Sequence, residues 1–103
     1  MRYDETDVPP RATFCIKISG DSMEPDYNDG DILFMESMPA IPNKALGVFG
    51  LNGEAIFKQL VVDHKNRRVK LHSINTKYND IVVGEDDVLH TYGLVIGKIG
   101  EES

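Results

Sequence analysis

The chain has 103 residues, which is enough for one domain with one modest core. It carries 11 lysines and arginines against 17 aspartates and glutamates, so its formal net charge at pH 7 is −6. Because nucleic-acid binding depends largely on cations that neutralise phosphates, this acidity argues against a nucleic-acid-binding surface. The basic residues that do cluster are expected to form a solvated strand end or turn. They are Lys65, Arg67, Arg68 and Lys70.

The sequence lacks the features of membrane and secreted proteins. Its apolar runs fall far short of the ~20 residues that span a membrane, and we expect no signal peptide. Cys15 is the single cysteine, which excludes an internal disulfide and is usual in a reducing compartment. The sequence therefore predicts a cytoplasmic protein without membrane association.

Residues 1–12 differ from the remainder of the chain. They are polar and acidic, and they contain Pro9-Pro10, which favours an extended conformation and removes backbone donors. We expect residues 1–12 to be a flexible tail or a linker remnant, and residues 13–103 to form the domain.

Seven short segments of the domain have strand character. In the first, Phe14, Ile16 and Ile18 alternate with more polar residues, which is the two-residue period of a half-buried strand. The segments are Phe14–Ile18, Ile32–Met35, Leu46–Leu51, Ala55–Val62, Val69–Ile74, Ile81–Val83 and Leu94–Ile99. No stretch has a convincing helical period, so we predict an all-β domain with at most short helical turns.

A hairpin is predicted at Asn52-Gly53, because this dipeptide between two apolar segments is a strong hairpin signal. On the strand after this turn, Ile56, Lys58 and Leu60 share one face. A lysine between two apolar neighbours loses hydration, which lowers its pKa. The alternative is that the lysine stem lies on the surface with its charge in water.

The loop Gly20–Pro25 is a candidate site for a nucleophile. Gly20 permits a sharp exit from the preceding strand and Pro25 stiffens the end of the loop, so Ser22 is displayed on a constrained turn. Adjacent backbone N–H groups in such a turn can hold a developing oxyanion. A serine in a tight turn is also common turn chemistry, so this loop leaves both interpretations open.

A serine nucleophile needs a base, and the histidines do not supply one. His64, His72 and His90 show no spacing typical of a catalytic triad or a zinc site. Lys58 is the remaining candidate, because a neutral lysine activates serine in Ser–Lys dyads. Lowering a lysine pKa from ~10.4 to about 7 needs roughly 4–5 kcal/mol of differential desolvation, which an apolar β face can provide.

Metal and cofactor motifs are missing from the sequence. The acidic run Asp26–Asp31 has its glycine one position early for a calcium loop, and Ser37 occupies the position of the required glutamate. Neither a P-loop nor a dinucleotide-binding glycine motif is present. We therefore predict no metal and no cofactor.

An ordered set of motifs resembles a known family. The set comprises Phe14–Ile18, Gly20-Asp21-Ser22-Met23-Glu24-Pro25, Asp29-Gly30-Asp31, Gly53-Glu54, Lys58-Gln59-Leu60, Leu71-His72-Ser73-Ile74-Asn75, Tyr78 and Gly93–Gly97. Their order, and the 36 residues between Ser22 and Lys58, resemble the C-terminal self-cleaving domain of LexA-like repressors, phage repressors and the UmuD protein. The resemblance covers about Thr13 to Ile99.

This resemblance implies a fold and a mechanism. The fold would be the strongly bent, mostly antiparallel β architecture of the LexA C-terminal domain. Ser22 would be the nucleophile of a serine peptidase, Lys58 its neutral base, and the amides of Asp21 and Ser22 its oxyanion hole. Such domains cut one peptide bond in the linker of their own chain.

The resemblance also implies partners. We expect a homodimer of a transcriptional repressor that contacts DNA only through an N-terminal domain not in this chain. A RecA–DNA filament, which triggers cleavage in the SOS response, is the expected co-protease.

Two features depart from the family. Only 21 residues precede Ser22, without the family's Ala-Gly or Cys-Gly cleavage pair, so we expect a product fragment that cannot cut itself in cis. Ile56 occupies the position, two before the lysine, where the family often has a hydroxyl. The alternative function is a dimerisation module with a vestigial dyad. A signal-peptidase relative is disfavoured, because we see no membrane anchor.

Overall fold

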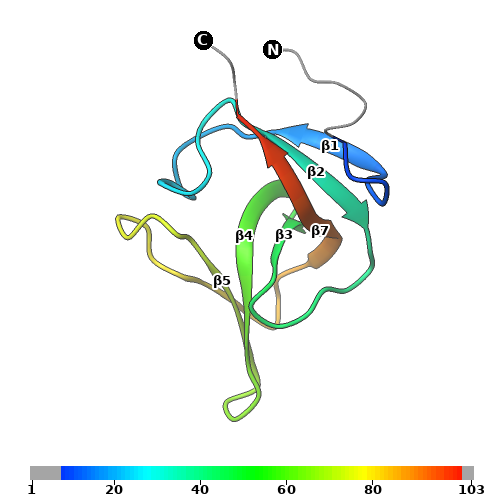
Figure 1. Ribbon diagram of the computed structural model, residues 1–103. Coiled ribbons are helices and arrows are strands. Elements are labelled where there is room, and N and C mark those ends of the chain that lie inside the picture. Colours follow the sequence, from blue (N-terminus) through cyan, green and yellow to red (C-terminus); the bar gives the residue numbers. More distant parts are fainter. Residues whose placement is uncertain (1–7, 101–103) are drawn as a thin grey trace.

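The computed structural model describes residues 8–100 as one curled antiparallel sheet (Figure 1). Its strands are β1 (Phe14–Lys17), β2 (Ile32–Ser37), β3 (Leu46–Leu51), β4 (Glu54–Asp63), β5 (Arg68–His72), β6 (Ile81–Val83) and β7 (Leu89–Ile99). They lie in the order β1-β2-β7-β3-β4-β5-β6, and every neighbouring pair is antiparallel. Residues 8–100 contain no helix, so the all-β prediction is confirmed.

Several strand boundaries differ from the predicted ones by one or two residues, and the start of β7 differs by five. β7 begins at Leu89 rather than Leu94, because its first residues pair with β3, with Leu89 opposite Leu51. β5 ends at His72 rather than Ile74, so the chain leaves the sheet two residues early. The residues after β5 are thereby free to contact another part of the molecule.

The predicted hairpin at Asn52-Gly53 joins β3 to β4. Both residues have the positive φ of a tight hairpin turn, 52° and 89°, and Leu51 pairs with Glu54. The resulting register places Lys58 opposite Gly47. The turn therefore sets the position of Lys58 on the sheet.

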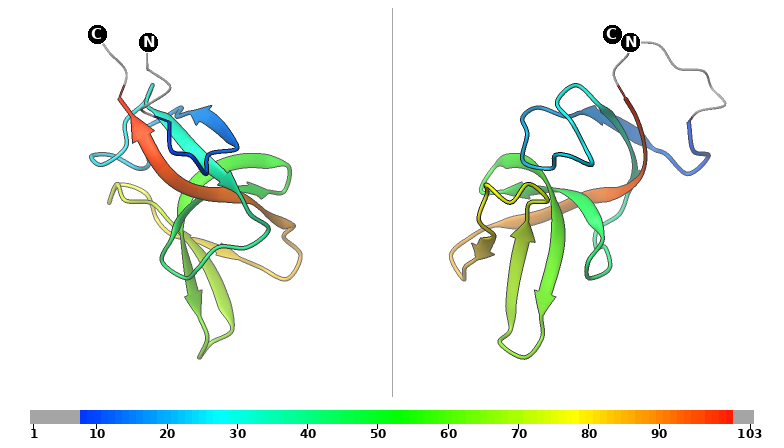
Figure 2. Two further views of the ribbon diagram at one scale, coloured as in Figure 1. Left: turned by 45° about the vertical axis from the view of Figure 1, so that its right-hand side comes forward. Right: turned by 60° about the vertical axis from the view of Figure 1, so that its left-hand side comes forward.

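The sheet packs apolar side chains into two clusters. The first is built on Ile18, Leu33, Met35 and Val48, and the second on Ile41, Phe49 and Leu71. Val48 and Phe49 are neighbours in β3 and point to opposite faces, so this strand contributes to both clusters. In Figure 2 the sheet curls so that β1 and β2 lie at one end and the β4–β5 hairpin projects at the other.

The N-terminal segment and the hairpin tip carry exposed basic side chains. The predicted tail lies partly outside the described residues, which begin at residue 8; within it, Arg11 forms an ion pair of 2.8 Å with Glu36. As predicted, the basic cluster lies at the turn of the β4–β5 hairpin, where Lys65, Arg67 and Arg68 are exposed. Within residues 8–100 there is no helix of the length and apolarity needed to cross a membrane.

Candidate active site

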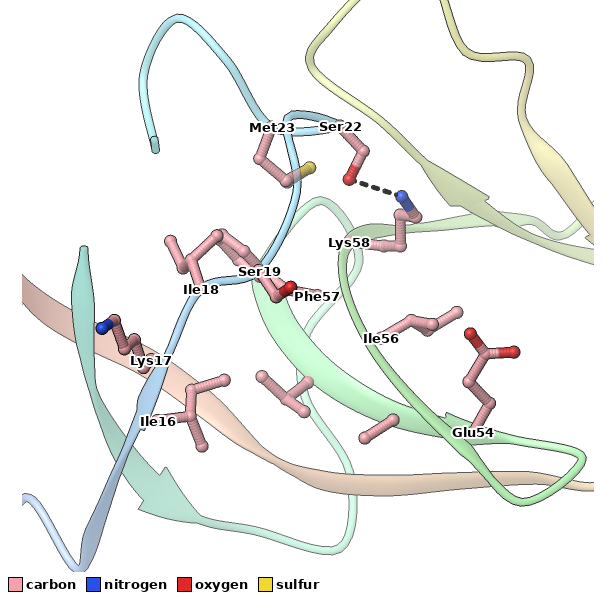
Figure 3. Close-up of a pocket in the computed structure, with 12 residues that line it drawn as sticks. Ile16, Lys17, Ile18, Ser19, Ser22, Met23, Glu54, Ile56, Phe57 and Lys58 are labelled. Atoms are coloured by element: carbon pink, nitrogen blue, oxygen red, sulfur yellow. Dashed lines mark hydrogen bonds between the residues drawn. The ribbon is translucent and has the colours of Figure 1, made fainter. Parts of the chain in front are cut away.

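The curled sheet brings Ser22 and Lys58 into contact. Lys58 Nζ lies 2.8 Å from Ser22 Oγ, within hydrogen-bonding distance (Figure 3). Ser22 comes from the loop after β1 and Lys58 from the middle of β4. The two residues that the sequence singled out are therefore neighbours, with the geometry of a nucleophile and its base.

Lys58 is buried in an apolar environment. Only 8% of it is exposed, and Ile56 and Leu60, on the same face of β4, pack against the second apolar cluster. Within residues 8–100 no carboxylate forms an ion pair with its ammonium group. Burial disfavours the charged form, and it lowers the pKa of Lys58 below the ordinary 10.5. The alternative of a solvated lysine head is therefore wrong.

Replacing Lys58 by methionine is expected to stabilise the domain at pH 7 by about 1 kcal/mol, because it removes a buried ionisable group. The folded-state pKa of Lys58 is lowered, so between that value and 10.5 the unfolded state binds more protons. The wild-type protein thus gains stability as pH rises through this window, and the advantage of the variant shrinks. Urea unfolding from pH 7 to 10.5 measures the difference.

Lys65→Met is the matched control, since Lys65 lies exposed in the β4–β5 turn. It is expected to change the free energy of unfolding by less than about 0.5 kcal/mol at every pH. A stability difference between wild type and Lys58→Met that stays constant with pH would show that burial does not act on the Lys58 charge.

The loop that carries Ser22 is closed at its base and anchored in its middle. Ile18 N–H donates to the carbonyl of Asp31 at 2.8 Å, and Gly30 N–H donates to the carbonyl of Ile18 at 2.9 Å. Gly20 turns the chain with φ of 99°, which a residue with a side chain rarely adopts. Met23 is only 2% exposed, so the side chain next to Ser22 is an apolar anchor.

The segment after β5 holds the same loop from outside the sheet. The Asn75 side chain donates from Nδ2 to the carbonyl of Asp21 at 2.9 Å, and its backbone N–H donates to the carbonyl of Ser22 at 2.9 Å. The Tyr78 hydroxyl donates to the Asp21 carboxylate, which raises the pKa of Tyr78. The sequence motif contained Asn75 and Tyr78, but no pattern in the sequence assigned them a contact.

A cleft of about 340 Å³ runs from the dyad between β1 and the beginning of β4 (Figure 3). Its lining is mainly apolar and comprises Ile16, Lys17, Ile18, Ser19, Ser22, Met23, Val48, Glu54, Ala55, Ile56, Phe57 and Lys58. β1 pairs only with β2, and residues 54–58 of β4 pair only with β3 within the described part of the chain. Two strand edges therefore lie unpaired on either side of the cleft.

Backbone donors are available beside Ser22. Among residues 8–100, the N–H groups of Asp21 and Ser22 donate to no acceptor. Ser22 itself lines the cleft. Amides without partners beside the serine meet one requirement of an oxyanion hole, which is a backbone donor that no other group occupies.

The histidines take no part in this site. His64 and His90 are exposed, and His72 Nδ1 lies 2.6 Å from Asp80 Oδ1, whereas none of the three lines the cleft. Within residues 8–100, no group of three or more histidine, cysteine, aspartate or glutamate side chains is arranged to hold a metal ion.

Comparison with known proteins identifies a family for this chain. The model of the peptidase S24-like family matches residues 1–96. The LexA repressor of Carboxydothermus hydrogenoformans is 30% identical over 100 residues, which cover 96% of this chain and 48% of that protein. The chain thus spans about half the length of this curated relative. On these grounds the chain belongs to the peptidase S24-like family, as a LexA-like domain.

Proposed function

We propose that this chain is the autoproteolysis and dimerisation domain of a LexA-like transcriptional repressor. Ser22 is the nucleophile and a neutral Lys58 is its general base. The observation that carries this proposal is the 2.8 Å contact between Ser22 Oγ and the Nζ of a lysine that is only 8% exposed. Burial lowers the pKa of this amine, which favours the neutral form that can accept the proton of a serine hydroxyl.

The proposed reaction uses the contact between Ser22 and Lys58. Lys58 Nζ takes the proton of Ser22 Oγ while Oγ attacks the carbonyl carbon of the scissile bond, and the amides of Asp21 and Ser22 donate to the oxyanion. The C–N bond then breaks, and Lys58 returns the proton to the leaving amine. Water hydrolyses the acyl-serine, with Lys58 acting again as base.

In the proposed reaction, the substrate segment binds along the cleft. An extended peptide between β1 and the beginning of β4 can form backbone hydrogen bonds with both unpaired edges. Ile16, Ile56 and Phe57 line this path, so apolar side chains of the substrate are favoured near the scissile bond. An uncharged segment of the same polypeptide fits this description.

Ile56 bears directly on how Lys58 is held. Where the family often places a hydroxyl, this chain has an apolar side chain on the same face as the lysine. Within residues 8–100, Ser22 Oγ is the hydrogen-bonding partner of Lys58 Nζ. Packing and desolvation therefore replace a second hydrogen bond in orienting the amine, and desolvation also favours its neutral form.

The activities of the whole protein belong to this proposal as well. The relative is a repressor of about twice this length, which supports an N-terminal DNA-binding part, dimerisation through this domain and a cytoplasmic location. A RecA–DNA filament is the proposed trigger. The acidic surface of the domain, at a net charge of −6, leaves DNA contact to other parts of the protein.

The nucleophile is tested with diisopropyl fluorophosphate, which modifies activated serines. We expect the wild-type protein to take up one diisopropylphosphoryl group on Ser22, located by mass spectrometry of a tryptic digest, and Ser22→Ala to take up none. Ser19→Ala, which removes another serine that lines the cleft, is the matched control and should still react.

A folded wild-type protein that stays unmodified would contradict the peptidase and favour the dimerisation module with an inert dyad. The bond that is cut is identified separately. The intact masses of the wild-type protein and of Ser22→Ala are compared, each expressed with its natural N-terminal sequence. The mass of the wild-type protein is expected to be lower by that of one cleaved segment.

A further inference from the structure

Asn75 contacts both peptide groups that flank Ser22. Its side-chain Nδ2 donates to the carbonyl of Asp21 and its backbone N–H donates to the carbonyl of Ser22, each at 2.9 Å. The first carbonyl belongs to the peptide plane before the Cα of Ser22, and the second belongs to the plane after it. One residue from a distant segment therefore fixes the orientation of the chain on both sides of the nucleophile.

Peptide planarity turns this contact into a constraint on the reacting groups. The carbonyl and the N–H of a trans peptide point in opposite directions, so a donor on the Asp21 carbonyl turns the Ser22 N–H away from Asn75. With both planes held, φ and ψ of Ser22 are set, and the direction of its Cα–Cβ bond is set with them. That bond carries the hydroxyl toward Lys58.

The Asn75 side chain is itself held in place. Its Oδ1 accepts a hydrogen bond from the N–H of Lys77 at 3.1 Å, and its backbone carbonyl accepts one from the N–H of Tyr78 at 3.1 Å. These bonds leave the amide nitrogen pointing out of its own turn, toward the Ser22 loop. In Figure 1 this turn, drawn in yellow, lies beside the loop in cyan.

We propose that Asn75 is a positioning residue for the peptidase reaction: its side chain orients the Ser22 N–H as an oxyanion donor, while its backbone N–H keeps the Ser22 hydroxyl against Lys58. This inference rests on the proposed function of the dyad. The two contacts have separable effects, because a side-chain substitution removes the first contact and leaves the second.

The test is the second-order rate constant for modification of Ser22 by diisopropyl fluorophosphate, measured from pH 6 to 10 on the full chain. In this reaction the Oγ–P bond forms, the P–F bond breaks with loss of fluoride, and the Oγ proton passes to Lys58. Asn75→Ala and Asn75→Asp are each expected to lower the rate constant by at least about tenfold, since each removes the donor that orients the oxyanion amide. The pH midpoint of the remaining reaction is expected to stay unchanged in Asn75→Ala.

Asn79→Ala is the matched control, because Asn79 is exposed on the same segment. It is expected to react like wild type, and circular dichroism checks that all variants are folded. An unchanged rate constant in Asn75→Ala would overturn the positioning role while leaving the dyad intact. A pH midpoint that rises in Asn75→Ala would also overturn it, because the substitution would then have separated Ser22 from Lys58. If wild type does not react at all, the proposed function itself fails.

Discussion

Replacing Lys58 by methionine is expected to slow the modification of Ser22 by diisopropyl fluorophosphate about a thousandfold. Methionine keeps the apolar stem of the side chain but has no nitrogen to take the Ser22 proton across the 2.8 Å contact. The serine then reacts only through its unactivated hydroxyl. Stopped-flow or intact-mass kinetics at pH 8 measure the rate constant, with the wild-type protein as reference.

The pH dependence of the same rate constant tests whether Lys58 is the base that takes the Ser22 proton. In the wild-type protein the rate constant is expected to rise with pH and level off below the ordinary lysine pKa of 10.5, because burial lowers the pKa of Lys58. In Lys58→Met this inflection should disappear. Lys17→Met, which changes a different lysine in the cleft lining, should keep it. An inflection that survives in Lys58→Met would assign the base to another group.

The burial and the position of Lys58 could be predicted from the sequence only in part. Alternation along β4 placed the lysine between Ile56 and Leu60, and the hairpin at Asn52-Gly53 fixed its register. These local patterns depend on neighbouring residues, so they are readable from sequence. Whether the amine was covered depended on the loop of Ser22, which lies 36 residues away and reaches β4 only because the sheet curls.

Some strand boundaries could likewise be predicted from the sequence, and others could not. β3 has the predicted bounds, because apolar residues and a turn signal mark both of its ends. The sequence does not predict the first half of β7, because His90 and Tyr92 are exposed and give this part of the strand no apolar pattern. Pairing with β3 holds it in the sheet instead. Backbone pairing between distant strands leaves little trace in composition.

The residues of the candidate site also fall into those that the sequence predicts and those that it does not. Ser22 and Lys58 could be named from sequence because a lysine on an apolar strand face is unusual, and because the order of the motifs and the 36 residues between Ser22 and Lys58 resemble the LexA family. Asn75 could not, since a lone asparagine after a strand is ordinary turn chemistry. Asn75 reaches the Ser22 loop because β5 ends at His72 and the chain then leaves the sheet. No local sequence pattern predicts this contact between two distant segments.

Replacing Phe49 by alanine is expected to have the largest effect on stability, at a cost of about 3–5 kcal/mol. Phe49 is fully buried at the centre of the second apolar cluster, the one against which Ile56 and Leu60 pack beside Lys58. A domain of this size is stable by only about 5–15 kcal/mol, so the melting temperature should fall by roughly 15 °C or more. Differential scanning calorimetry measures it.

Phe49→Ala and Lys58→Met are both expected to lose Ser22 modification, but for different reasons. Phe49→Ala is expected to lose Ser22 modification in step with unfolding and to recover it on cooling, whereas Lys58→Met stays folded and unreactive. Val82→Ala, at a residue that is 47% exposed, is the control and should change stability by less than about 0.5 kcal/mol. If Phe49→Ala melts within a few degrees of wild type, the second cluster does not hold β3 and β4 together. The burial of Lys58 would then depend on contacts other than those of its β4 neighbours, because Ile56 and Leu60 pack against that cluster.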